Sequence, residues 1–169
     1  DNINTDLIAG LPTDTPESFK NSLDSIVRLN AECITVHTLC MKRASRLTTE
    51  GVTLDLQQAR DAREMLAYTQ NILGQNEYIP YYMYRQSRMV GNLENVGWSK
   101  RGFESLYNVY VMDETHTILA CGSGGVTKLK RNNPDYLERI FNFKYPYEYI
   151  DRFDELIQRK SGIMQFYGQ

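Results

Sequence analysis

One stretch near the start of the chain determines the predicted fold: residues 5–27, TDLIAGLPTDTPESFKNSLDSIV. Thr5 to Ala9 is a short apolar run that ends at Gly10-Leu11-Pro12, which predicts a buried strand followed by a turn. Thr15 before Pro16 is typical of a helix N-cap with proline in the first turn. The helix that follows would have one apolar face, formed by Phe19, Leu23, Ile26 and Val27. The stretch therefore predicts a strand followed by a helix.

The rest of the chain continues this alternation. We expect further strands at 33–39, 78–84 and 117–121, helices at 55–73, 134–141 and 146–160, polar loops at 41–52 and 86–102, and either a helix end or a strand at 107–112. Strands that alternate with helices predict βαβ units, a parallel sheet and the α/β class. Such a sheet needs cover on both faces, so three or four strands suggest part of a larger barrel or sheet.

Composition excludes several classes of protein. The chain has 169 residues, roughly one domain, and its 41% hydrophobic share is ordinary for a globular protein. The net charge of -2 argues against a protein that binds by covering phosphates. No apolar run reaches the roughly 20 residues of a membrane span, and the N-terminus has no signal-peptide pattern. Because Asp1 lies so close to the first strand, we expect a piece of a longer protein.

The three cysteines and two histidines do not form a recognisable catalytic or metal-binding motif. Cys33, Cys40 and Cys121 are odd in number and widely spaced, which favours reduced thiols and a cytoplasmic location over disulfides. Six residues separate Cys33 from Cys40, a spacing that fits neither a zinc site nor an iron–sulfur site. His37 and His116 are interpreted as packed or solvated side chains rather than bases. We therefore expect no metal site within this chain.

Two short features lie where parallel α/β folds gather ligands, at the carboxyl ends of strands. Asp6, in the first strand, is a carboxylate that could accept hydrogen bonds from ribose hydroxyls; the alternative is a strand-end Asp satisfied by nearby backbone. Gly122-Ser123-Gly124-Gly125 follows the strand expected at 117–121 and could form an anion-binding nest or a plain tight turn. It is neither G-x-G-x-x-G nor a P-loop.

A tyrosine- and arginine-rich segment follows the strand expected at 78–84. Twelve tyrosines in the chain against six phenylalanines make this composition unusual, and several of them cluster at residues 78–84. Aromatic rings interleaved with Arg could stack nucleic-acid bases. They could also line a pocket for a flat macrocycle whose carboxylates pair with Arg85 and Arg88, or form a plain exposed loop. The negative net charge disfavours the nucleic-acid alternative.

Five segments together resemble one enzyme family. Residues 6–12, DLIAGLP, and 15–19, TPESF, resemble a segment of the oxygen-independent coproporphyrinogen III oxidases, which are radical S-adenosylmethionine (SAM) enzymes of haem biosynthesis. Residues 89–97, MVGNLENVG, are similar to the coproporphyrinogen dehydrogenase-like subgroup of Gram-positive bacteria. The glycine turn at 119–126, LACGSGGV, and the final 161–164, SGIM, also resemble that subgroup. The resemblance covers essentially the whole chain.

The resemblance implies a fold and a set of cofactor contacts. Residues 1–127 would be the C-terminal part of a partial (β/α) radical SAM barrel, and residues 128–169 a helical C-terminal extension. The family holds a [4Fe–4S] cluster on C-x3-C-x2-C, a motif this sequence lacks, so its ligands are expected upstream. Asp6 matches a contact to the SAM ribose, while Cys40 and Val126 fall at contacts on the adenosine side. No residue here is implied to be catalytic.

The implied reaction is oxidative decarboxylation of coproporphyrinogen III propionates to vinyl groups, which gives protoporphyrinogen IX. The partners would then be a tetrapyrrole substrate and an electron donor to the cluster, with no membrane and no nucleic acid. Arg85 and Arg88 are our hypothesis for the residues that bind substrate carboxylates. Without cluster ligands, the isolated chain is predicted to be inactive. Alternatives are a non-catalytic haem- or tetrapyrrole-binding relative, a radical SAM enzyme with another substrate, and an RNA-binding module at residues 81–88.

Overall fold

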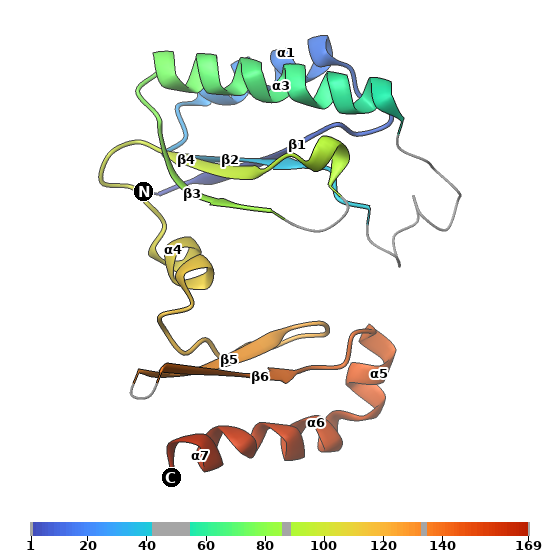
Figure 1. Cartoon of the computed structure of the whole chain (residues 1–169), viewed down its shortest axis with the longest axis vertical. Helices are drawn as coiled ribbons and strands as arrows, with labels where there is room; N and C mark the ends of the chain where they lie inside the picture. Colours follow the sequence, from blue (N-terminus) through green and yellow to red (C-terminus); the bar gives the residue numbers. More distant parts are fainter. Residues whose placement is uncertain (1, 42–54, 86–88, 133–134, 169) are drawn as a thin grey trace. The chain divides into compact units, whose positions relative to one another are not determined.

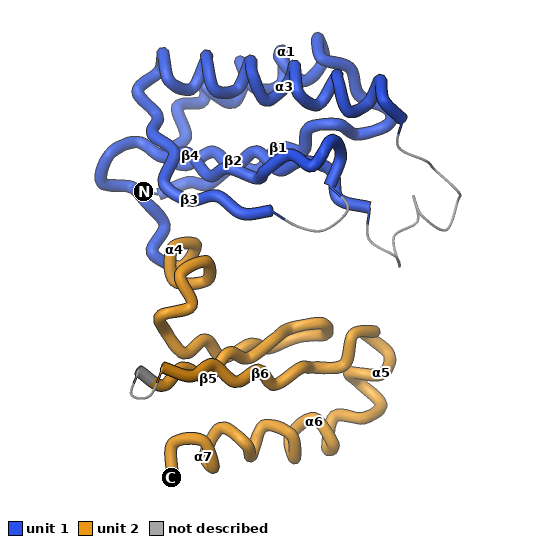
Figure 2. The backbone as a smooth tube through the Cα atoms, viewed as in Figure 1, with its two compact units in different colours: residues 1–106 blue, residues 107–169 orange. Residues whose placement is uncertain are grey.

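The chain forms two compact units, which are described one at a time. The computed structural model describes residues 2–41, 55–85, 89–132 and 135–168. The first unit spans Asp1–Leu106 and the second Tyr107–Gln169 (Figure 2). None of the helices that the structure describes is long and apolar enough to span a membrane.

The first unit is a four-stranded sheet with two long helices. Its elements are β1 (Asn4–Ala9), α1 (Pro16–Leu29), β2 (Cys33–Thr38), α3 (Leu56–Gln75), β3 (Ile79–Tyr84), the short 3-10 helix η1 (Val90–Asn92) and β4 (Asn95–Ser99). The strand order is β1-β2-β4-β3. β1 pairs in parallel with β2, while β4 is antiparallel to both β2 and β3. β1, β2 and β3 therefore run in the same direction. β4 lies between β2 and β3 and runs in the opposite direction.

Each of the two helices begins at a capping residue, and the one at Thr15 is the cap that the sequence predicts. The Thr15 side chain accepts a hydrogen bond from the Ser18 amide at 3.2 Å, and α1 ends where Asn30 adopts a left-handed conformation. α3 begins with a capping box in which Asp55 and Gln58 bond to each other's backbone amides. α3 continues through Gly74 to Gln75, one residue past the stop that the glycine predicts.

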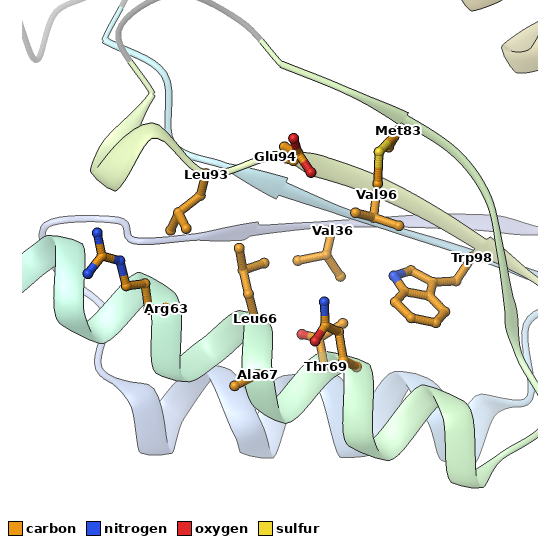
Figure 3. Close-up of a pocket in the computed structure, with 11 residues that line it drawn as sticks. Val36, Arg63, Leu66, Ala67, Thr69, Met83, Leu93, Glu94, Val96 and Trp98 are labelled. Atoms are coloured by element: carbon orange, nitrogen blue, oxygen red, sulfur yellow. The ribbon is translucent and has the colours of Figure 1, made fainter.

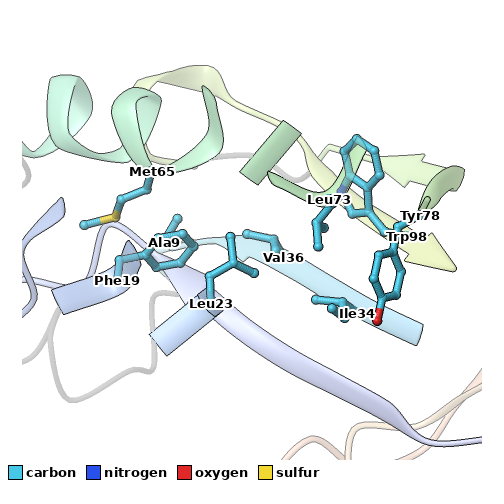
Figure 4. Close-up of a cluster of buried hydrophobic side chains, with 9 residues drawn as sticks. All are labelled: Ala9, Phe19, Leu23, Ile34, Val36, Met65, Leu73, Tyr78 and Trp98. Atoms are coloured by element: carbon cyan, nitrogen blue, oxygen red, sulfur yellow. The ribbon is translucent and has the colours of Figure 1, made fainter. Parts of the chain in front are cut away.

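The two helices cover the same face of the sheet, and the main core lies beneath them (Figures 1 and 4). The core side chains come from both helices and from β1, β2 and β4 and the residue before β3: Ala9, Phe19, Leu23, Ile34, Val36, Met65, Leu73, Tyr78 and Trp98. Since side chains alternate along a strand, the residues between these core positions point to the opposite face. That opposite face, which neither α1 nor α3 covers, is called the open face below.

The expected loop at 86–102 is wrong in its second half. Residues 95–99 form β4, an inner strand of the sheet. Asn95 and Gly97 are typical of loops, but Val96 and Trp98 alternate with them and pack against the core. Burial of these two side chains outweighs the local signal. The expected all-parallel sheet is also wrong, because only β1 and β2 pair in parallel.

The described residues of the second unit form a hairpin and four short helices. Its elements are α4 (Leu106–Asp113, whose first residue belongs to the first unit), β5 (Val126–Asn132), β6 (Asp135–Phe141), α5 (Pro146–Asp151), α6 (Phe153–Lys160) and α7 (Gly162–Tyr167). β5 and β6 pair antiparallel along their whole length. Glu114 accepts from Lys128 at 2.8 Å and from Arg139 at 2.7 Å, and these two cations are cross-strand partners. Their hydrogen bonds, Lys128 first, lower the pKa of Glu114.

The structure corrects three predicted elements of the second unit. The helix expected at 134–141 is wrong, since residues 135–141 form the strand β6. The backbone of β6 pairs with β5, a strand that the sequence analysis did not predict. The strand expected at 117–121 is reduced to a single bridge between Ile118 and Lys128. The helix expected at 146–160 is divided at Arg152 into α5 and α6. The boundary expected at 127/128 falls within β5, and the division into barrel and extension stays a prediction.

The packing predicts that Leu23 is far more important for stability than its neighbour Leu29 on the same helix. Leu23 is completely buried, whereas Leu29 is 76% exposed. We expect Leu23→Ala to lower the free energy of unfolding by about 2–5 kcal/mol through lost burial and a cavity. Leu29→Ala, the matched control, should change it by less than about 0.5 kcal/mol. Urea denaturation measures both, and equal effects would contradict this packing.

Candidate functional site

Polar and aromatic side chains gather on the open face of the first unit. One row crosses all four strands, because Asp6 pairs with Thr35, Thr35 with Gly97, and Gly97 with Tyr82. A second row carries His37 of β2 beside Asn95 of β4, which pairs with Tyr84 of β3. Residues from four separate strands thus form one polar surface, and we take this surface as the candidate site.

Asp6 is the exposed carboxylate of this surface. It is the third residue of the six-residue β1, so it lies on the sheet face and not at the strand end. Its side chain is 58% exposed. Oδ1 accepts a hydrogen bond from Asn4 Nδ2 at 3.0 Å and lies 3.7 Å from His37 Nε2. Asp6 is therefore both oriented by neighbours and accessible to a ligand.

Two tyrosine rings form the aromatic part of the surface. Tyr82 lies flat over Gly97, where a Cβ atom would fall well inside contact distance of the ring. The Tyr82 and Tyr84 rings are stacked, with centroids 6.3 Å apart and planes inclined by 4°. Burial raises the pKa of both hydroxyl groups, so both stay protonated at neutral pH. Gly97 is what allows the first of these rings to lie on the sheet.

His37 connects the tyrosines to the carboxylate. Its Nδ1 lies 3.2 Å from the Tyr84 hydroxyl, and its Nε2 faces Asp6. The sequence analysis interpreted this histidine as packed or solvated and missed its position between two functional groups. Gly97 was quoted only as part of a motif. A lone His or Gly carries no local signal of such a role, because strand register alone produces these contacts.

Cys40 lies two residues after the last residue of β2, beyond the carboxyl end of the strand. It is half-buried and forms an isolated bridge with Met89. The pKa of Tyr84, raised first by burial, is raised further by both Asp6 and Cys40, so all three groups are within electrostatic reach. Two of the predicted cofactor contacts, Asp6 and Cys40, are therefore near the same tyrosine.

Arg85 follows β3 and is engaged in an ion pair. Its guanidinium donates to Glu94 Oε1 at 2.7 Å, and its side chain is 55% exposed. Exposed pairs of this kind contribute about 0–1 kcal/mol, so Arg85 can exchange Glu94 for another carboxylate at little cost. Arg88, the second arginine predicted to bind substrate, lies outside the described residues.

The glycine turn belongs to the second unit. Its amides are used within the chain: Gly122 donates to Tyr149 Oη at 3.3 Å, and Gly124 to the Phe143 carbonyl at 2.7 Å. Gly125 closes the turn on the Gly122 carbonyl. This arrangement favours the tight-turn alternative over an anion-binding nest. Val126, the third predicted cofactor contact, directly follows the turn as the first residue of β5.

A cavity of about 270 Å³ lies on the other side of the sheet, between α3 and the strands (Figure 3). Its walls are mostly core side chains, including Val36, Leu66 and Trp98, with Arg63 and Glu94 as the charged members. Neither Asp6 nor Cys40 lines it. Among the residues that the structure describes, no group of three His, Cys, Asp or Glu side chains could hold a metal ion.

Comparison with known proteins identifies relatives over nearly the full chain. The chain is 37% identical over 164 residues, 97% of its length, to the "Oxygen-independent coproporphyrinogen-III oxidase-like protein HemZ" of Bacillus subtilis (strain 168). The resemblance to the oxygen-independent coproporphyrinogen III oxidase family is thereby confirmed. The aligned region is 33% of the HemZ protein, so the chain spans about a third of this curated relative. No family model matches the chain.

A solved structure supports the same fold. Coproporphyrinogen III oxidase (HemN) from Escherichia coli, described as a radical SAM enzyme, matches with a TM-score of 0.55. The match covers 90% of this chain and 34% of HemN at 17% identity, which supports the mixed α/β fold alone.

The position of Tyr82 predicts that Gly97 tolerates no larger residue. Gly97→Ala would force the ring off the sheet, and we expect it to lower the free energy of unfolding by about 1–3 kcal/mol. The control is Gly74→Ala in α3, where a Cβ atom would meet nothing within 4 Å. That change should stabilise the helix by up to about 1 kcal/mol. Chemical denaturation distinguishes the two, and a harmless Gly97→Ala would refute this placement of Tyr82.

Proposed function

We propose that this chain is part of a radical SAM enzyme that oxidatively decarboxylates coproporphyrinogen III. The 37% identity to HemZ over nearly the whole chain supports the family, and the polar open face supports a binding site there. We further propose that residues 1–127 belong to a partial barrel with the open face inward. In such a barrel, ligands gather on the side to which the parallel strands point. We propose that the enzyme is cytoplasmic and that a separate electron donor reduces its cluster.

The observation that carries the proposal is the exposed carboxylate of Asp6. Among the described residues, hydrogen-bond donors reach only Oδ1, so Oδ2 is available to accept from a hydroxyl group. A carboxylate in this position fits a ribose diol, and Cys40 after β2 would present backbone to the adenosine side. When bound, SAM and its reduced cluster supply the radical chemistry, while the protein supplies placement. The cluster ligands are expected outside this sequence, and no residue here is assigned to them.

The tetrapyrrole would meet the tyrosines and the arginines. Tyr82 and Tyr84 offer flat, largely apolar surfaces with protonated hydroxyl groups, which suit the edge of a macrocycle. Arg85 at the end of β3 could exchange Glu94 for a propionate, and Arg88 would be its second partner. Nothing among these residues needs to act as an acid or a base.

Asp6→Asn in the intact protein is the first test. We expect it to weaken binding of S-adenosylhomocysteine by about 10-fold or more, since hydrogen bonds to a charged acceptor contribute about 1.5–3 kcal/mol. Asp154→Asn, on the exposed surface of α6, is the matched control and should bind normally. Calorimetric titration under anaerobic conditions measures both. Equal affinities for the two variants would remove Asp6 from the site.

The reaction itself is tested with carboxyl-labelled coproporphyrinogen under reducing, anaerobic conditions. Release of labelled CO2 by the intact protein is the expected result. SAM cleavage without CO2 would favour a radical SAM enzyme with another substrate. Tetrapyrrole binding with neither reaction would favour the non-catalytic relative.

Arg85 has a separate prediction. Arg85→Gln should raise the KM for the tetrapyrrole about 10-fold through loss of a charge-assisted pair, with kcat less affected. Glu94→Gln releases Arg85 from its ion pair, and we expect KM to stay equal or to fall. Steady-state kinetics of both variants provide the comparison. Unchanged turnover and KM in an Arg85→Ala/Arg88→Ala double variant would overturn the assignment.

A further inference from the structure

The hydrogen bonds around His37 connect it to Tyr84 and, through Tyr84, to Asn95. A backbone amide can only donate, and Thr38 N donates to Asn95 Oδ1 at 2.6 Å. The Asn95 side chain is also bonded to Tyr84, so its Nδ2 must be the donor there. The Tyr84 hydroxyl lies 3.2 Å from His37 Nδ1, within hydrogen-bond distance, and His37 Nε2 faces Asp6 Oδ1 at 3.7 Å.

A second chain of hydrogen bonds reaches the same oxygen from the other tyrosine. Asn4 Nδ2 donates to Asp6 Oδ1, which leaves Asn4 Oδ1 as an acceptor. The Thr35 hydroxyl, 3.3 Å from that oxygen, donates to it. The Thr35 hydroxyl has one proton, which is used in the bond to Asn4. Thr35 therefore accepts a hydrogen bond from the Tyr82 hydroxyl at 3.3 Å. This second chain ends on Oδ1 of Asp6, while the first ends at His37, whose Nε2 faces the same oxygen at 3.7 Å.

We propose that His37 is a positioning residue that holds Asp6 in the orientation needed to bind the ribose hydroxyls of the SAM nucleoside. This inference rests on the proposed function. With one carboxylate oxygen held by Asn4 and faced by His37, the rotation of the Asp6 side chain is restricted. Oδ2, which no hydrogen-bond donor among the described residues reaches, is then the atom that would accept from a diol.

The geometry indicates a role in binding and not only in folding. The second chain runs from the half-buried Tyr82 to a carboxylate that is 58% exposed, and the first runs from the half-buried Tyr84 to His37, which faces that carboxylate. A network that served only the core would not end at solvent, where water satisfies the carboxylate equally well. The distance of 3.7 Å between His37 Nε2 and Asp6 Oδ1 is longer than a hydrogen bond. The two atoms can therefore move closer together when a ligand fixes Asp6.

The test measures discrimination between two ligands instead of affinity alone. The intact protein is titrated anaerobically with S-adenosylhomocysteine and with its 2′,3′-dideoxy analogue, and the ratio of the two dissociation constants is recorded. We expect a ratio of about 10 or more in the natural protein and a ratio near 1 in Asp6→Asn. His37→Ala should lower the natural ratio about 3-fold or more, because Asp6 loses one of its two restraints. His37→Gln, whose Nε2 can replace the imidazole donor, should restore it to within about 2-fold of natural.

Three outcomes overturn the inference. If the ratio is unchanged in His37→Ala but falls in Asp6→Asn, His37 does not position Asp6 while the proposed function stands. If His37→Ala weakens both ligands equally, His37 is only structural. If Asp6→Asn leaves the ratio unchanged, the proposed role of Asp6 fails together with this inference. His116→Ala, which removes the other histidine of the chain, is the matched control and should keep the natural ratio.

Discussion

The alternation of side chains along β2 is the constraint on which both the core and the candidate site depend. Ile34 and Val36 lie beneath the helices, and their burial fixes which face of the strand turns inward. Thr35 and His37 then lie on the open face, the same face as Asp6, which pairs with Thr35 on the neighbouring strand. A register slip of one residue would bury His37 and expose Val36, so the apolar core stabilises the site without contacting it.

β4 is the element that turns this polar face into an organised surface. Because it runs antiparallel between β2 and β3, it brings Asn95 beside both Thr38 and Tyr84. Two residues further, Gly97 leaves room for the Tyr82 ring, whose hydroxyl reaches across to Thr35 on β2. The same short strand therefore sets the direction of one hydrogen-bond chain and the starting point of the other.

The sequence predicted the elements whose signals are local. β1, α1 and β2 are confirmed because apolar runs, Thr15 and Pro16 act within a few residues. β4 was missed because its partner β2 is distant in sequence and Asn95 and Gly97 are typical of loops. The β5–β6 hairpin pairs strands that are neighbours in sequence, and it was missed because Pro134 is typical of a helix start. Asp6 was proposed through a family resemblance, whereas the contacts of His37 follow only from the register of three strands.

The neutral amide that bonds to Asp6 has an electrostatic consequence for binding. Among the described residues, no Lys or Arg pairs with this carboxylate, and its hydrogen bond comes from the uncharged Asn4 side chain. Neutral donors orient a carboxylate while leaving its full negative charge, whereas a cation would compensate that charge and weaken it as an acceptor. A charged acceptor binds hydroxyl groups more strongly than a neutral one, and SAM itself carries a positive sulfonium. A carboxylate oriented by the Asn4 amide, with no Lys or Arg of the described residues paired to it, thus favours the kind of ligand that the proposed function requires.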